Sequence, residues 1–177
     1  MYIPKEVERI LFTKEQLDER IKQLGEEITR DYAGSSPLLL GVLRGAAVFM
    51  VDLMREVELP VKIDFIRTQS YVGTESSGKV KVDLMNVGDI SGQDVLIVED
   101  ICDTGRSLVE INKALKAKAP KSLKTVCLLD KPSRRVVDFR PDYTGFSIDD
   151  YFVVGSGFDC DGKYRNLPYI GVYSAER

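Results

Sequence analysis

Histidine and tryptophan are absent from this chain of 177 residues, and only three cysteines occur in it. Without histidine, any acid–base chemistry must rest on carboxylates, lysine, tyrosine or cysteine. Cys102, Cys127 and Cys160 are odd in number and widely spaced. They therefore predict neither a disulfide framework nor a zinc site, and we expect a reducing, cytoplasmic location.

Long hydrophobic runs and long basic runs are missing as well. The richest apolar stretches, residues 37–43 and 46–54, are much shorter than the roughly 20 residues that a transmembrane helix requires. The first residues are charged early and lack the apolar region of a signal peptide. The formal net charge is -3. We expect neither a membrane nor a nucleic acid as a partner.

Segments of strand type and helix type alternate along most of the chain. Short apolar runs predict buried strands at residues 38–43, 61–66, 95–98 and 123–129. Helical spacing of apolar residues, with a capping box at Thr13, predicts helices at 13–28, at 46–57 and from residue 104. Such alternation predicts an α/β fold with an open, mostly parallel twisted sheet and helices on both faces.

The remaining segments predict how this sheet is completed. Residues 79–84 alternate charged and apolar side chains, which indicates a strand at an edge or in a flap. After about residue 145 only short strands are expected, at 151–154 and 169–172. The length suits a single domain of residues 1–177. We expect a core at about 35–145 and a small hood lobe from about 146–177 with part of the N-terminus.

The strongest functional signal is the stretch V-L-I-V-E-D-I-C-D-T-G-R-S-L at residues 95–108. A buried strand here leads through a turn into a helix, whose free N–H groups and positive dipole end favour anions. Thr104 and Ser107 add hydroxyl groups, Gly105 allows close approach of the backbone, and Arg106 adds a cation. The turn therefore predicts a site for a phosphate monoester.

Three acids precede this turn, and they would repel a phosphate unless a cation or sugar hydroxyls lay between. Glu99 and Asp100 lie at the carboxyl end of the strand, where open α/β sheets bind ligands. Together they can accept from a vicinal diol or hold Mg²⁺ through oxygens and water. Asp103 would face the centre of the pocket. The alternative is a structural corner, since Asp, Ser and Thr also cap helices.

Cations follow two other strand ends. Arg44 and Gly45 come just before a helix that favours anions, although an ordinary glycine turn with an exposed arginine is the alternative. Lys131 follows the strand at 123–129. Its ammonium group only donates hydrogen bonds, so it suits a ligand oxygen and opposes an amino group. The alternative is a solvated lysine in a basic run with Arg134 and Arg135.

The 95–108 stretch resembles the phosphoribosyl-pyrophosphate (PRPP) signature of the type I phosphoribosyltransferases, most closely the hypoxanthine-guanine branch. Further elements of that family occur in its order from about residue 37 to 167. The resemblance implies the type I phosphoribosyltransferase fold, Mg²⁺ as cofactor and a homodimer or homotetramer. It also implies a purine salvage reaction that transfers the 5-phosphoribosyl group of PRPP to N9 of hypoxanthine or guanine, giving IMP or GMP and pyrophosphate.

The same resemblance assigns the PRPP site. The groups that would bind the 5′-phosphate and ribose are Glu99, Asp100, Asp103, Thr104, Gly105, Arg106 and Ser107. Pyrophosphate would be bound by Arg44, Gly45 and Arg165, often with a non-proline cis peptide in the Leu43–Gly45 turn. Metal ions would be held by Glu99, Asp100 and, for a second ion, Asp159.

The purine site and the catalytic base follow from the resemblance too. Lys131 would meet the 6-oxo group, Phe152 would stack on the ring and the backbone of Val153 would bind its edge, near Asp159. Asp103 is the candidate general base near purine N7. In the polar stretch 67–79, Ser70 and Tyr71 would form a flap over the site. The alternative for that stretch is a plain surface loop.

Other functions fit the sequence less well. Residues 159–162 lack most ligands of an EF-hand loop, and residues 155–157 lack the third glycine of a dinucleotide fingerprint. A regulator that keeps the PRPP site but binds nucleic acid would need a basic face. An enzyme of the same fold that uses xanthine, uracil or orotate is the other alternative. Lys131 and Phe152 favour a 6-oxopurine over a pyrimidine.

Overall fold

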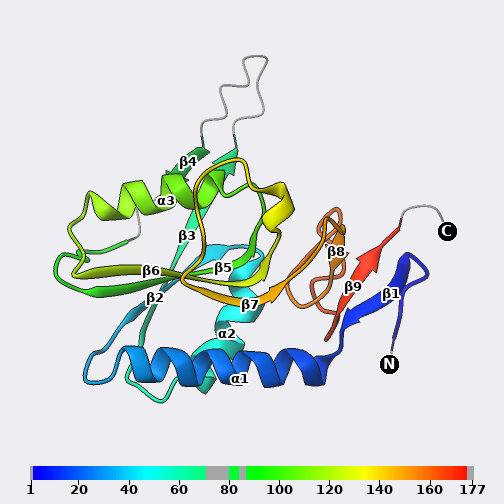
Figure 1. The fold of residues 1–177 in the computed structure, drawn as a ribbon, viewed down its shortest axis with the longest axis horizontal. Helices are drawn as coiled ribbons and strands as arrows, with labels where there is room; N and C mark the ends of the chain where they lie inside the picture. The colour runs from blue at the N-terminus through cyan, green and yellow to red at the C-terminus, as the bar shows by residue number, and fades with distance from the viewer. Residues whose placement is uncertain (1, 71–79, 84–86, 175–177) are drawn as a thin grey trace.

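Figure 1 presents the protein as a computed structural model, which describes residues 2–70, 80–83 and 87–174. At its centre lies a sheet of order β4-β3-β2-β5-β6-β7. Its strands are β2 (Leu38–Leu43), β3 (Lys62–Ser70), β4 (Val80–Asp83), β5 (Asp94–Cys102), β6 (Ser122–Asp130) and β7 (Tyr143–Ser147). All neighbours pair in parallel except β4, which runs antiparallel to β3 at the edge. The mostly parallel sheet is therefore confirmed.

Helices cover both faces of this sheet, as the sequence predicts. The long helix α1 (Lys14–Asp31) and α2 (Ala46–Glu56) lie on one face, while α3 (Arg106–Lys116) lies on the other (Figure 1). Thr13 begins α1 with the expected capping box, in which its side chain and that of Gln16 each accept from the other residue's backbone N–H. A short 3₁₀ turn, η1 (Pro132–Arg134), follows β6.

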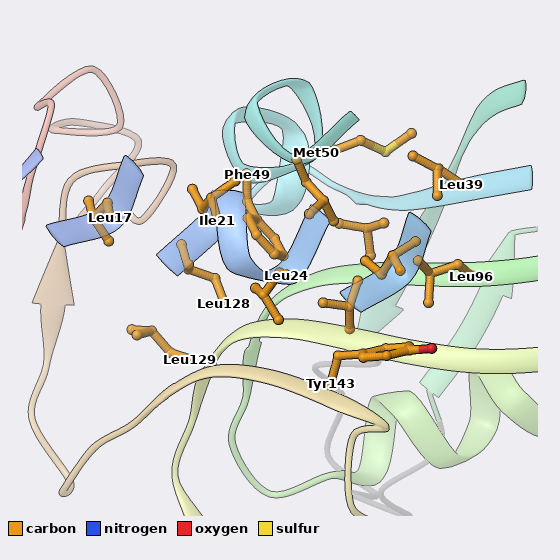
Figure 2. Packing of buried hydrophobic residues seen from close by; sticks show 14 of the residues in the cluster. Leu17, Ile21, Leu24, Leu39, Phe49, Met50, Leu96, Leu128, Leu129 and Tyr143 are labelled. Carbon is orange, nitrogen blue, oxygen red and sulfur yellow. The ribbon is translucent and has the colours of Figure 1, made fainter. Parts of the chain in front are cut away.

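The core beneath α1 and α2 fixes the strands that carry the functional loops. Figure 2 shows Leu24 of α1 and Phe49 of α2 packed over Leu96 of β5 and Leu128 of β6. These four side chains are fully buried. Buried apolar side chains of this size each contribute about 1.5–3 kcal/mol to folding. The strand ends that leave this core are therefore held in fixed positions.

A second, smaller sheet brings the two ends of the chain together. Strands β1 (Val7–Phe12), β9 (Ile170–Tyr173) and β8 (Val153–Val154) pair antiparallel in the order β1-β9-β8. The expected short strands of the C-terminal region are thus present, each shifted by one or two residues. Among the described residues no helix is long and apolar enough to cross a membrane.

Several boundaries differ from the sequence prediction, and three of them lie beside the functional residues. Strand β3 continues to Ser70, so residues 67–70 are not part of a surface loop; they pair with β4, which supplies their backbone partners. Strand β5 continues past residue 98 to Cys102, so Glu99 and Asp100 lie within it. Helix α3 begins at Arg106 instead of Thr104, because Gly105 adopts a left-handed conformation with φ of 82°.

Candidate active site

A cavity of about 360 Å³ opens at the carboxyl ends of β2, β3 and β5, beside the start of α3. It brings seven residues of the predicted PRPP site together: Gly45, Glu99, Asp100, Asp103, Thr104, Gly105 and Ser107. Arg44 and Arg106, also predicted, are exposed and do not line it. Thr68 of β3 lines it and was not predicted. Its only signal in the sequence is its place near the carboxyl end of a predicted strand.

Glu99 and Asp100 form a closely spaced, shielded pair of acids. Only 8% of Glu99 is exposed, and the pKa of its carboxyl is raised well above the usual range by burial, with the charge of Asp100 adding to the effect. Burial raises the pKa of Asp100 as well. The Asp100 N–H donates to Glu99 Oε1 at 3.1 Å. Such a pair gains most from a ligand that brings positive charge or hydroxyl donors.

The turn between β2 and α2 meets these acids. The Leu43–Arg44 peptide bond is cis, as the family resemblance implies for this turn. Gly45 caps the N-terminus of α2, and its Cα faces the Asp100 carboxylate so closely that no side chain would fit between them. Two chain segments that are distant in sequence thereby form one wall of the cavity.

The turn before α3 is packed from behind by the segment that follows β6. A Cβ added at Gly105 would lie 2.8 Å from Val137 Cγ2 and 2.9 Å from Arg135 Cδ. The Val136 N–H donates to the Thr104 carbonyl at 3.2 Å. Gly105 thus provides close approach of the backbone, as expected, but the contact seen here is to the protein's own chain. The first N–H groups of α3 keep their capacity to bind an anion.

A chain of ion pairs connects Lys131, in the predicted base site, to Asp103. Lys131 is buried, and its Nζ lies 3.5 Å from Asp150 Oδ1. Arg134 bridges the two acids, with Nη1 3.2 Å from Asp150 Oδ2 and Nε 3.0 Å from Asp103 Oδ1. From the sequence, Arg134 is named only in the alternative of a solvated basic run, and Asp150 is not identified. The polar Asp149-Asp150 pair just before Phe152 was the available signal.

The predicted residues of the C-terminal region fall into two places. Phe152 is 56% exposed, with its ring in a T-shaped contact with Tyr173 at a centroid distance of 5.6 Å, while Val153 is buried. Arg165 binds Asp159, with Nη2 2.5 Å from Oδ1, and also donates to the Gly157 carbonyl. The pyrophosphate arginine and the second-metal acid of the prediction are therefore partners of each other.

The remaining predicted residues are the metal ligands and the flap. Within the described residues, no three acidic or cysteine side chains come together as a metal site, so Asp159 does not join Glu99 and Asp100 in one group. Ser70 is the last residue of β3. Tyr71, the other expected flap residue, lies outside the described residues.

Comparison with known proteins agrees with this geometry. The phosphoribosyl transferase domain family matches residues 11–162. The hypoxanthine-guanine phosphoribosyltransferase of Lactococcus lactis is 44% identical over 175 residues, 98% of this chain and 95% of that protein. A solved hypoxanthine phosphoribosyltransferase from Staphylococcus aureus is 42% identical with a TM-score of 0.91, covering 96% of this chain and 92% of that one.

A structure from another organism is as similar in shape. A variant of the hypoxanthine phosphoribosyltransferase from Trypanosoma cruzi, solved in a ternary complex with substrates, has a TM-score of 0.92 and 40% identity, covering 98% of both chains. The fold, the cavity at the sheet's carboxyl edge and these matches agree, and the chain belongs to the phosphoribosyl transferase domain family.

Proposed function

We propose that this protein is a hypoxanthine-guanine phosphoribosyltransferase, which transfers the 5-phosphoribosyl group of PRPP to N9 of hypoxanthine or guanine. The observation that carries the proposal is the cavity that joins the Gly45 turn, the paired acids and the turn before α3. A phosphate, a ribose and a pyrophosphate each find suitable chemistry in it. The similarity to named enzymes of this activity over nearly the whole chain supports the same function.

In this proposal PRPP lies along the cavity. The 5′-phosphate binds at residues 104–107, where the N-terminus of α3 offers N–H groups and hydroxyls. Glu99 and Asp100 accept from the ribose hydroxyls. Arg44, Gly45 and Arg165 receive the leaving pyrophosphate, and Arg165 must then exchange part of its contact with Asp159 for the new anion.

The acids also suit a metal. Glu99 and Asp100 present only oxygen donors, the kind that Mg²⁺ prefers, and their burial next to each other makes a bound cation favourable. They would hold Mg²⁺ together with oxygens of PRPP. When bound, Mg²⁺ supplies positive charge that stabilises the leaving pyrophosphate. A second Mg²⁺ near Asp159 is part of the same proposal.

The purine would lie between the β6–η1 turn and the C-terminal region. Lys131 donates to the 6-oxo group, the exposed Phe152 stacks on the purine ring and the Val153 backbone binds the ring edge, with Asp159 nearby. Asp103 takes the proton from purine N7 as N9 bonds to C1 of the ribose. Because Arg134 holds Asp103 in the structure, the purine must share or displace that contact.

Three further features belong to this proposal. Ser70 and Tyr71 would close over the reacting sugar and exclude water. The three cysteines are free, which fits a cytoplasmic enzyme. A homodimer or homotetramer would be the working form.

The test is turnover with PRPP and Mg²⁺ against a panel of hypoxanthine, guanine, xanthine, uracil and orotate, with the nucleotide product identified by mass spectrometry. We expect IMP and GMP, each with one pyrophosphate released. Turnover confined to a pyrimidine would replace the proposed substrate class. No turnover with any base would favour the regulatory alternative, which keeps the PRPP site without catalysing transfer.

A further inference from the structure

Arg135 contacts both the turn before α3, which lines the cavity, and the segment after β6 that carries Lys131, although it does not line the cavity itself. Its side chain is only 13% exposed, unlike that of its neighbour Arg134 at 46%. A guanidinium group has five donors in a rigid fork, so a buried arginine with several acceptors fixes the relative positions of those acceptors.

On one side Arg135 holds the turn that precedes α3. Its Nη2 donates to the Cys102 carbonyl at 3.3 Å, and its Nε donates to the Asp103 carbonyl at 3.2 Å. Its Cδ packs against Gly105. Arg135 therefore contacts the end of β5 and two residues of the turn that carries the candidate general base and the phosphate site.

On the other side Arg135 holds the segment that carries Lys131. Its Nη2 pairs with the carboxylate of Asp130, the residue just before Lys131, and its Nη1 donates to the Phe139 carbonyl at 3.0 Å. The Lys131 N–H donates to the same Cys102 carbonyl that Arg135 binds, at 2.9 Å. One guanidinium group thus fastens the base-binding segment to the phosphate-binding turn.

We propose that Arg135 is a positioning residue that sets the distance between the 5′-phosphate turn and the purine-binding lysine. This inference rests on the proposed function. Each loop alone can bind its own part of the substrates, but C1 of the ribose and N9 of the purine meet only when both loops are in register. A misplacement of about 1 Å can cost roughly 10²-fold in rate.

The proposal is tested with Arg135→Lys, which keeps the charge beside Asp130 but loses the fork. Three quantities are measured: the Kd of ribose 5-phosphate, which needs the phosphate turn and the paired acids but not the lysine segment; the Kd of IMP, which needs the lysine segment as well; and kcat. We expect the ribose 5-phosphate Kd to stay within about twofold, the IMP Kd to rise about tenfold or more and kcat to fall about 10²-fold. Arg140→Lys, an exposed arginine of the same segment, should leave all three unchanged.

A second variant guards against loss of folding. Asp130→Asn removes the charge that Arg135 pairs with next to Lys131 and leaves the turn before α3 unchanged. It should raise the IMP Kd and lower kcat in the same way as Arg135→Lys, but by smaller factors. If the Kd values of ribose 5-phosphate and IMP rise by the same factor in both variants, or if neither Kd rises, the positioning role is wrong. If the wild-type protein binds ribose 5-phosphate but not IMP and shows no turnover, the proposed function fails and the inference fails with it.

Discussion

The carboxylate of Asp100 occupies the space where Gly45 would carry a side chain: a Cβ at Gly45 would overlap Asp100 Oδ2. These residues belong to different strand ends that the parallel pairing of β2 with β5 brings together. The contact joins the turn proposed for pyrophosphate to the acids proposed for ribose and Mg²⁺. Glycine at position 45 is therefore required by packing.

Gly45→Ala should damage both the fold and the activity. The new methyl group must displace Asp100 or the turn, which we expect to lower the free energy of unfolding by about 1–3 kcal/mol. Turnover should fall by roughly 10²-fold or more, because the acids move relative to the leaving group. Denaturant unfolding and steady-state kinetics measure the two effects. Gly88→Ala, where a Cβ meets nothing within 4 Å, is the control and should change stability by less than about 0.5 kcal/mol.

Glu99→Gln should raise the stability of the substrate-free protein at neutral pH. Burial raises the pKa of Glu99 in the folded state, so the folded protein binds more protons than the unfolded one as pH rises above the ordinary glutamate pKa. The wild type therefore loses stability as pH rises through this window, and the amide variant lacks the contribution of Glu99 to that loss.

The measurement for Glu99→Gln is the difference in Tm between variant and wild type across the pH range. This difference should be positive at neutral pH and shrink toward acidic pH. A difference that is the same at every pH, or larger in acid, would contradict the role of burial. Glu26→Gln, an exposed site on α1, should show no such trend.

Asp103→Asn should lower kcat by about 10²–10⁴-fold, the usual contribution of a general base. PRPP binding should remain measurable, since the turn and the paired acids stay intact. Burst and steady-state kinetics with isothermal titration separate the two effects. A variant with wild-type turnover would rule out Asp103 as the base. Arg134→Gln is informative beside it, because that change frees Asp103 from the observed ion pair without altering the acid itself.

Lys131→Ala should impair the use of oxopurines far more than it weakens the binding of PRPP. Removal of the buried ammonium group would leave the 6-oxo group of the bound purine without a donor, which lowers the binding free energy by about 1–3 kcal/mol or more. We therefore expect kcat/KM for hypoxanthine to fall at least tenfold while the Kd of PRPP changes little. Lys116→Ala at the end of α3, exposed and distant from the base site, serves as the control. Equal losses for both substrates would contradict base recognition.

Structure could be predicted best where the composition of a single segment is enough to indicate its strand or helix. Residues 38–43 are apolar throughout because β2 is buried on both faces, and the structure confirms these bounds. Strand β7 was missed because Tyr143–Ser147 is mixed in polarity. It is held partly by a distant side chain, since Arg20 of α1 donates to the carbonyls of Thr144 and Gly145 at 2.8 and 3.0 Å.

In the candidate site, too, residues of one continuous stretch could be predicted, while contacts between distant segments could not. The acids and the phosphate turn lie in one continuous stretch, and the cavity brings most of them together as predicted. The chain of contacts from Lys131 through Asp150 and Arg134 to Asp103 could not be predicted, because it joins three segments whose approach depends on the whole fold. The contacts of Arg135 with both segments could not be predicted for the same reason.

The most direct test of the proposed function is the ratio of kcat/KM for hypoxanthine to that for adenine, with PRPP and Mg²⁺ at saturation. Lys131 can only donate, and adenine presents an amino group where hypoxanthine presents an oxygen. Sites that hydrogen-bond a substrate group reject the mismatched analogue by about 10⁴–10⁵-fold, and we expect a ratio in that range. A ratio near one, or a preference for adenine, would contradict the assignment of this protein to 6-oxopurines.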